Sequence, residues 1–169
     1  MNGVAKVANV SGSQTLRAEQ ATAPSEPVFT RVLVPTDFSH RSEAAIEYAV
    51  EIARSMHAQL TILHIMAESS AFEYTLGGLP PGEWDQAKEE AEKKLAEETI
   101  RTKLIYREVG SLLRTGLDLR DEILKAAKEI SADLLILSTH GYTGWKHLLL
   151  GSDAEEILKH ADCPVLIVR

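Results

Sequence analysis

VLVPTDFS, at residues 32–39, is the stretch that decides how the chain is interpreted. It opens with three apolar residues, two of them β-branched, which favour a short buried strand ended by Pro35. After Thr36-Asp37-Phe38, Ser39 suits the N-cap of a helix, because its hydroxyl can accept a hydrogen bond from a free N–H group. Apolar residues then recur at helical spacing over 45–56. The stretch therefore predicts a strand followed directly by a helix.

The same alternation continues to the end of the chain. Further strands are predicted at 60–66, within 106–115, at 134–138 and at 165–168, and further helices at 84–101, at 118–130 and from 152 onward. Strands this apolar are typical of a parallel sheet with helices on both faces. We therefore expect one doubly wound α/β domain over residues 28–169. Residues 1–27 lack periodic apolar positions and are expected to form a flexible extension.

Composition limits the possible functions. The formal net charge of −7 argues against a sequence-independent nucleic-acid binder, because phosphate contacts require a basic face. A single cysteine, Cys163, excludes an internal disulfide and a multi-cysteine metal site. No apolar run approaches the ~18 residues that span a membrane, and residues 1–10 lack the apolar core of a signal peptide. We expect a cytoplasmic protein with neither a nucleic-acid nor a membrane partner.

Two predicted strands end in residues that could bind a ligand. Asp37 follows the first strand, and Ser138 closes the fourth, just before Thr139-His140-Gly141. Ligands of open α/β sheets bind at the carboxyl ends of the strands, where the strand order reverses. A carboxylate there could accept hydrogen bonds from a ribose hydroxyl or a base edge. Alternatively, Asp37 only organises the turn through bonds to nearby backbone groups.

A glycine-bounded loop precedes the last predicted helix. Gly141 and Gly151 bracket nine residues, and Ser152 opens the helix. Free N–H groups at a helix start favour anions, and glycine lets the backbone approach a phosphate closely. The same start also fits a capping box between Ser152 and Glu155. The two interpretations are compatible, because several N–H groups stay free in the first turn.

The commoner nucleotide and catalytic motifs are missing. The sequence has no P-loop, no G-x-G-x-x-G after the first strand and no nucleophile elbow. His64 lies in an apolar strand and is interpreted as a packed or hydrogen-bonded residue, not as a ligand. Because no general base stands out, the sequence does not predict a proper enzyme.

Four segments, residues 32–39, 132–141, 148–152 and 163–168, resemble the universal stress protein family. Together they extend the resemblance over about residues 29–169. The family implies a five-stranded parallel sheet of order 3-2-1-4-5. It also implies homodimers, commonly joined through the last strand, here Val165–Val168.

The resemblance to the ATP-binding branch of the family implies a site for ATP, or for ADP or AMP. That branch carries G-x2-G-x9-G-[S/T], which Gly141 and Gly151-Ser152 match, whereas Ser138 stands at the first glycine position. Asp37 would contact the adenosine part and Ile65 would pack on the adenine. By position, the site residues would be Pro35, Thr36, Asp37, Ile65, Leu137, Ser138, His140, Gly141, Gly151, Ser152, Asp153 and Ala154.

Three functions remain open at this point. The first is a nucleotide-binding homodimer that acts in the stress response. The second is a nucleotide-independent interaction module of the same fold, with Ser138 closing the pocket. The third is a weak metal-dependent ATP hydrolase with Asp37 or Asp153 as cation ligands. A carboxylate at Asp153 repels phosphates unless Mg²⁺ or Mn²⁺ bridges them. Nucleotide retained through purification would separate the first function from the second.

Overall fold

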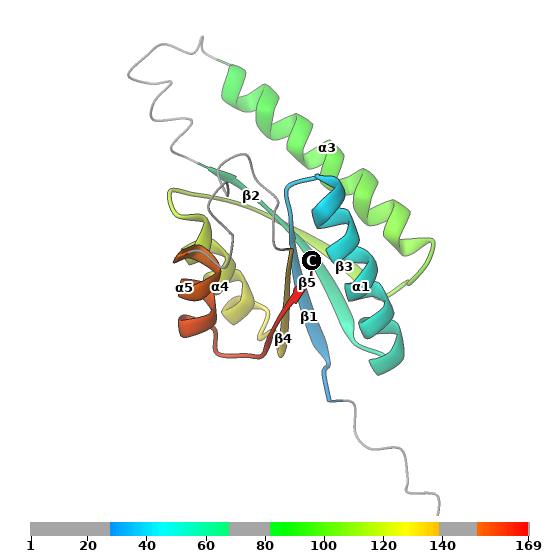
Figure 1. Cartoon of the computed structure of the whole chain (residues 1–169). Coiled ribbons are helices and arrows are strands. Elements are labelled where there is room, and N and C mark those ends of the chain that lie inside the picture. The colour runs from blue at the N-terminus through cyan, green and yellow to red at the C-terminus, as the bar shows by residue number, and fades with distance from the viewer. Residues whose placement is uncertain (1–27, 68–81, 139–151, 169) are drawn as a thin grey trace, which may run out of the picture.

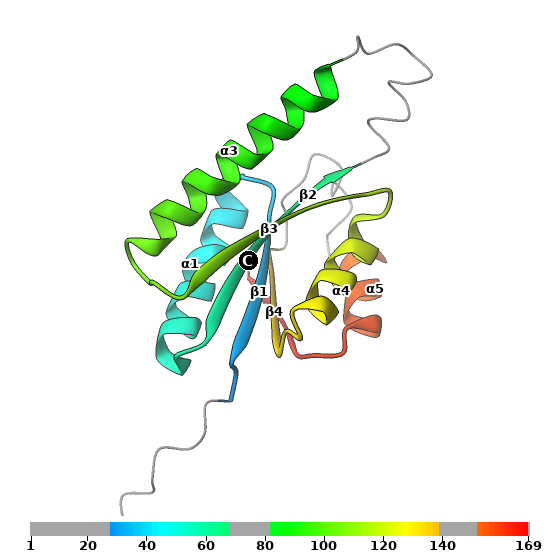
Figure 2. The same cartoon turned by 180° about the vertical axis from the view of Figure 1, so that it is seen from behind.

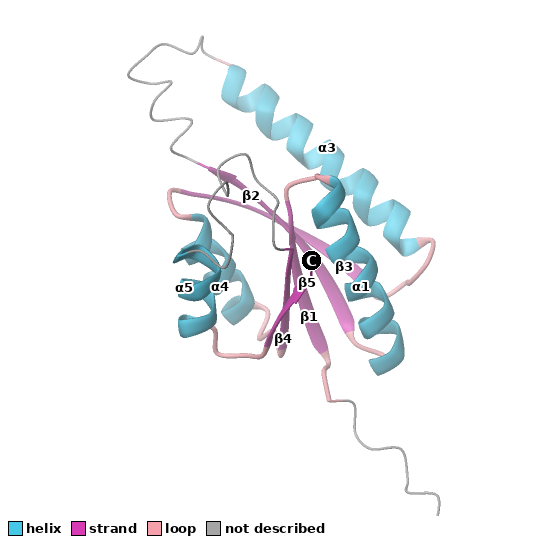
Figure 3. Cartoon of the chain, in the orientation of Figure 1, coloured by secondary structure: helices cyan, strands magenta, loops and turns pink. Residues whose placement is uncertain are grey.

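The structure, a computed structural model, describes residues 28–67, 82–138 and 152–168. Strands and helices alternate through these ranges (Figure 1, Figure 3). In chain order they are β1 (Arg31–Thr36), α1 (His40–Met56), β2 (Gln59–Ala67), α3 (Glu83–Lys103), β3 (Val109–Gly116), α4 (Leu119–Glu129), β4 (Leu134–Ser138), α5 (Ser152–His160) and β5 (Val165–Val168). The predicted extension, residues 1–27, lies outside the described residues.

The five strands form one parallel sheet in the order β3-β2-β1-β4-β5, as predicted. Helices α1 and α3 cover one face, and α4 and α5 cover the other (Figure 1, Figure 2). The fold is therefore the doubly wound α/β arrangement expected from the sequence. In such sheets the strand order reverses at one point, here between β1 and β4.

Each face of the sheet carries its own apolar core, and β1 contributes to both. Val32 and Val34 pack in the cluster beneath α1, whereas Leu33 packs with residues of α4 and α5. All three are fully buried. Burial on both faces explains why the sequences of β1 and β4 are nearly continuous apolar runs and do not alternate with polar residues.

Two helices begin at the caps that the sequence predicts. The hydroxyl of Ser39 accepts a hydrogen bond from the N–H of Ser42 at 3.3 Å, and the carboxylate of Asp118 accepts one from the N–H of Arg120 at 2.9 Å. Both caps satisfy N–H groups that a helix leaves free at its start. None of the helices in the described ranges is long and apolar enough to cross a membrane.

β1 differs from the prediction, because it does not end at Pro35 but continues to Thr36. The backbone explains how a proline fits. The carbonyl of Thr30 accepts from β2, and that of Arg31 accepts from Asp133 before β4. Backbone groups of a strand alternate between its two neighbours, so the nitrogen of Pro35 is on the β4 side. Proline has no N–H to donate there.

The pairing pattern of the sheet reflects this missing donor. β1 pairs with β2 along its whole length, but it pairs with β4 only through Val32 and Leu33. β4 meanwhile pairs with β5 up to its last residue, Ser138. Beyond Leu33, the carboxyl-terminal halves of β1 and β4 therefore separate, at the point where the strand order reverses.

Candidate functional site

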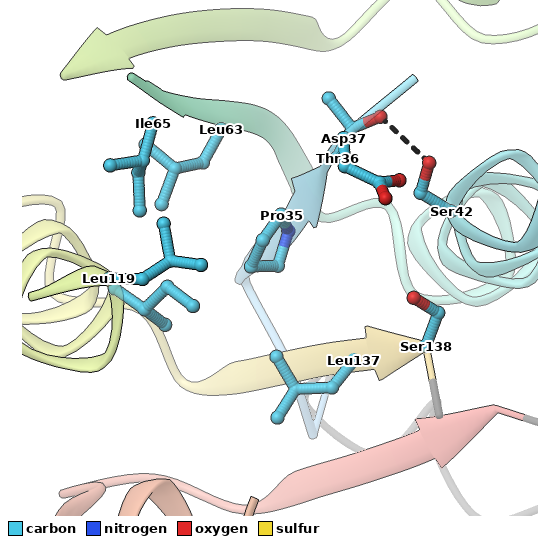
Figure 4. Close-up of a pocket in the computed structure, with 10 residues that line it drawn as sticks. Pro35, Thr36, Asp37, Ser42, Leu63, Ile65, Leu119, Leu137 and Ser138 are labelled. Atoms are coloured by element: carbon cyan, nitrogen blue, oxygen red, sulfur yellow. Dashed lines mark hydrogen bonds between the residues drawn. The ribbon is translucent and has the colours of Figure 1, made fainter. Parts of the chain in front are cut away.

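A pocket opens where β1 and β4 separate (Figure 4). Its empty space is about 390 Å³, a figure that includes open solvent at the mouth. Six predicted site residues line it together, namely Pro35, Thr36, Asp37, Ile65, Leu137 and Ser138. Four further lining residues were not predicted, namely Ser42, Leu63, Leu119 and Ile123.

One wall of the pocket is polar and is built by the turn between β1 and α1. The buried hydroxyl of Thr36 donates to the hydroxyl of Ser42 at 3.1 Å and accepts from the N–H of Phe38 at 3.0 Å. The hydroxyl of Ser42 in turn donates to the carbonyl of Ser39 at 2.8 Å. These short-range bonds give the turn one defined shape.

The carboxylate of Asp37 belongs to the same turn. Its Oδ1 accepts hydrogen bonds from the N–H and the hydroxyl of Ser39, at 3.0 and 2.6 Å. Within the described part of the chain, Oδ2 of Asp37 takes part in no hydrogen bond. The alternative of a turn-organising aspartate is therefore correct for one oxygen, while the second oxygen has acceptor capacity for a ligand in the pocket that Asp37 lines.

The other wall is apolar and comes from several elements. Ile65 from β2, Leu137 from β4 and Ile123 from α4 are all nearly or fully buried in the core beneath α4 and α5. Leu119, at the start of α4, completes this wall. An apolar surface facing a polar turn suits a ligand with one flat, weakly hydrated part and several hydrogen-bonding groups.

α4 is joined to β3 by an ion pair between the buried Glu122 and the partly buried Arg114. The carboxylate of Glu122, which is 7% exposed, accepts hydrogen bonds from Arg114 of β3 and from Lys125, both at 2.8 Å. These bonds, that from Lys125 first, hold the pKa of Glu122 below its usual value, although burial raises it. Gly116 makes room for this side chain, since a Cβ on Gly116 would lie 2.4 Å from Cγ of Glu122.

His64 is packed and hydrogen-bonded, as predicted. It is 7% exposed, and its Nδ1 lies 2.8 Å from the carbonyl oxygen of Thr36. Burial lowers the pKa of His64, and the bond to Thr36 and the charge of Asp37 act in the opposite direction. The net effect lowers the pKa and so favours the neutral form of the ring.

The remaining predicted site residues fall at the two ends of the glycine-bounded segment and at the start of α5. His140, Gly141 and Gly151 lie outside the described residues. Ser152 opens α5, as predicted, but the side chains of Ser152, Asp153 and Ala154 are not among those described. The phosphate-binding half of the site therefore stays a prediction. Within the described ranges, no group of three His, Cys, Asp or Glu side chains could hold a metal ion.

Two of the four missed residues come from α4. Leu119 and Ile123 stand in the first turns of that helix, next to the predicted cap Asp118. In a doubly wound sheet, each helix starts near the carboxyl ends of the strands, so the first turn of α4 was a candidate for this edge. Its leucine and isoleucine, however, look like any buried helix residues.

The model of the universal stress protein family matches residues 29–169. The chain belongs to this family. A curated relative, universal stress protein MJ0531 of Methanocaldococcus jannaschii, is 32% identical over 149 residues, which cover 85% of this chain and 84% of that protein.

Solved structures of universal stress proteins share the fold. The structure of MJ0577 of Methanocaldococcus jannaschii matches with a TM-score of 0.67 and 28% identity, covering 83% of this chain and 96% of that one. A universal stress protein in complex with cAMP matches with a TM-score of 0.58 and 25% identity, covering 83% and 97%. These matches agree with the strand order found in this chain.

Proposed function

We propose that this universal stress protein binds ATP, or the related nucleotides ADP or AMP, in the pocket between β1 and β4, and acts in the stress response as a cytoplasmic homodimer. The observation that carries the proposal is the pairing of Asp37 with the apolar wall of Ile65 and Leu137 in one pocket. An adenine ring is flat and weakly hydrated, and its edge and the ribose offer donors to a carboxylate. The relative solved with cAMP holds a ligand of the same chemical class.

The described residues fit the adenosine part of the ligand. Oδ2 of Asp37 can accept from an amino group or a hydroxyl, and the hydroxyl of Ser138 can donate or accept at the end of β4. A serine adds only a small side chain where the family pattern has glycine, so it leaves room for the ligand. Binding of the phosphates by Gly151 and Ser152, with Mg²⁺ or Mn²⁺, belongs to the same proposal.

Calorimetric titration of Asp37→Asn tests the site. Asparagine keeps an oxygen that can accept from Ser39, so the turn is preserved, but it removes the charge and presents an amide to the ligand. We expect the affinity for ATP with Mg²⁺ to fall by about 1–3 kcal/mol, the range for a lost hydrogen bond to a charged group. The melting temperature without ligand should change little.

Asp133→Asn is the matched control. Asp133 also accepts hydrogen bonds from backbone groups, those of Thr30 and Arg31 at 2.8–3.0 Å, but it precedes β4 at the amino-terminal edge of the sheet. Its substitution should alter stability without altering nucleotide affinity. If the wild-type chain shows no saturable heat with ATP, ADP, AMP or cAMP at millimolar concentration with Mg²⁺, the function is that of an interaction module.

The homodimer is proposed to form through β5. Among the described residues this strand lies at the edge of the sheet, with no neighbouring strand on its outer side. Leu166 in its middle is 37% exposed. Pairing with a second copy would satisfy the backbone groups on that side and cover this side chain. Sedimentation equilibrium of the full chain distinguishes the dimer from a monomer.

A further inference from the structure

His64 is a buried titratable residue for which the proposed nucleotide site has no direct use. It neighbours Ile65 in β2, and successive side chains of a strand point to opposite faces. Ile65 lines the pocket and packs with the core beneath α4 and α5. His64 therefore faces α1 and α3, on the other side of the sheet from the pocket.

Two contacts join His64 to the residues that flank Asp37. Its Nδ1 lies 2.8 Å from the carbonyl oxygen of Thr36. A carbonyl can only accept, so Nδ1 carries the proton and donates. The ring also lies against that of Phe38, with 4.3 Å between the ring centres and a tilt of 32°. His64 thus holds the chain immediately before and immediately after Asp37.

Phe38 has an unusual backbone conformation. Its φ is 61°, in the left-handed region that residues with a Cβ rarely adopt. Glycine would adopt this conformation at lower cost. Phenylalanine instead contributes a ring that packs on His64, and its N–H donates to the hydroxyl of Thr36. Strained residues of this kind persist where their surroundings hold them in place.

We propose that His64 is a positioning residue for the adenine-nucleotide site, which fixes the direction of the Asp37 carboxylate by holding Thr36 and Phe38 from the opposite face of the sheet. The expected effect of His64 on nucleotide affinity rests on the function proposed above. Its expected effect on the turn between β1 and α1 does not, because the stability of that turn can be measured without a ligand. The hydrogen bond from His64 to the carbonyl of Thr36 holds the residue before Asp37. The ring of Phe38, the residue after Asp37, packs against the His64 ring.

Three variants of the full chain separate the contributions. His64→Phe keeps a ring beside Phe38 but removes the donor. His64→Asn restores a donor, because its amide nitrogen occupies the position of Nδ1. Tyr106→Phe is the matched control, since the hydroxyl of Tyr106 also donates to a backbone carbonyl, that of Ala58 at 2.7 Å, at the other end of β2.

The first measurement is amide hydrogen exchange without ligand. In His64→Phe, the amides of Phe38 and Ser39 should exchange roughly three- to tenfold faster, the ratio expected for one lost hydrogen bond. His64→Asn and Tyr106→Phe should leave both rates near those of the wild type. Unchanged rates in His64→Phe, or equally raised rates in His64→Asn, would overturn the proposal. If His64→Phe does not fold, His64→Gln replaces it, because its amide lies one bond farther along the side chain.

The second measurement is binding of ATP with Mg²⁺. His64→Phe should weaken it roughly three- to tenfold, and His64→Asn should restore it. In the Asp37→Asn background, His64→Phe should cause no further loss, because both changes act on the same contact. Additive losses would show that His64 does not act through Asp37. If the wild type binds no adenine nucleotide, the proposed function is wrong, and the exchange rates still decide the role of His64.

Discussion

The two walls of the pocket are held by different kinds of interaction. The polar wall is a network of hydrogen bonds among residues no more than six positions apart, from Thr36 to Ser42. The apolar wall brings together β2, β4 and α4, and α4 is held by the ion pair between Arg114 and Glu122. The polar wall is thus built mainly within one short sequence, to which His64 of β2 adds one hydrogen bond at Thr36. The apolar wall depends on the packing of distant segments.

The largest effect should come from disturbing the apolar wall at Gly116. In Gly116→Ala the new Cβ would lie 2.4 Å from Cγ of Glu122, so the side chain or α4 must move. Because Glu122 is buried and paired with Arg114, we expect a loss of about 1–3 kcal/mol in the free energy of unfolding. Thermal and urea unfolding measure it.

Gly110→Ala is the control in the same strand. No atom lies within 4 Å of the Cβ that it would add, and neither glycine has a positive φ. Its stability should stay close to that of the wild type or rise slightly. Equal losses in both variants would mean that the contact with Glu122 does not fix α4.

A smaller effect is expected in the polar wall, from Ser42→Ala. The hydroxyl of Ser42 is buried and joins Thr36 to the carbonyl of Ser39. Its removal should lower the free energy of unfolding by about 1 kcal/mol, the contribution of a typical hydrogen bond. Ser55→Ala, which removes a hydroxyl bonded to the carbonyl of Ile52 on the exposed side of the same helix, should have no comparable effect in the same unfolding experiment.

The smallest effect is on the pH dependence of stability. Burial lowers the pKa of His64 from 6.5, helped by the charge of Lys94 and opposed by the bond to Thr36 and the charge of Asp37. The unfolded chain therefore binds this proton more readily than the folded chain. The contribution of neutral His64 to the free energy of unfolding is fully present above pH 6.5, and it is lost as the pH falls below that value.

Urea unfolding between about pH 8 and pH 5, on either side of the ordinary histidine pKa, tests this sign. The fall in stability toward the acid end should be steeper in the wild type than in His64→Phe. An identical slope in both proteins would contradict the prediction. Stability should fall again at much lower pH, as Asp118 becomes protonated, because hydrogen bonds from Arg120 lower the pKa of Asp118 to about 2.

The same contrast explains what could be predicted from the sequence. The cap at Ser39 depends on neighbouring residues and was predicted. The turn bonds of Asp37 also depend on neighbouring residues, and they were one of two alternatives that the sequence left open. The strand order came from the family resemblance, since the pattern of apolar runs indicates a parallel sheet but not which strands are neighbours. Leu119 and Ile123 were missed, because their contribution to the pocket depends on how α4 is seated on the sheet.

Phe38 and His64 show a further limit. A left-handed φ at a phenylalanine carries no signal in the sequence, since glycine and asparagine are the residues that usually mark it. His64 was correctly predicted to be hydrogen-bonded, but its partner, the carbonyl of Thr36, is set by the register of β2 on β1. Every residue has a backbone carbonyl, so the sequence does not indicate which one accepts the hydrogen bond from His64, and the structure is needed to identify it.

Pro35 has a consequence for anyone who wishes to redesign this fold. Here the missing N–H of one imino acid in the central strand lies on the side where β1 is no longer paired with β4. Valine at this position would supply the missing ladder donor and favour closure of the sheet, while proline at the same place in a related scaffold would favour an opening.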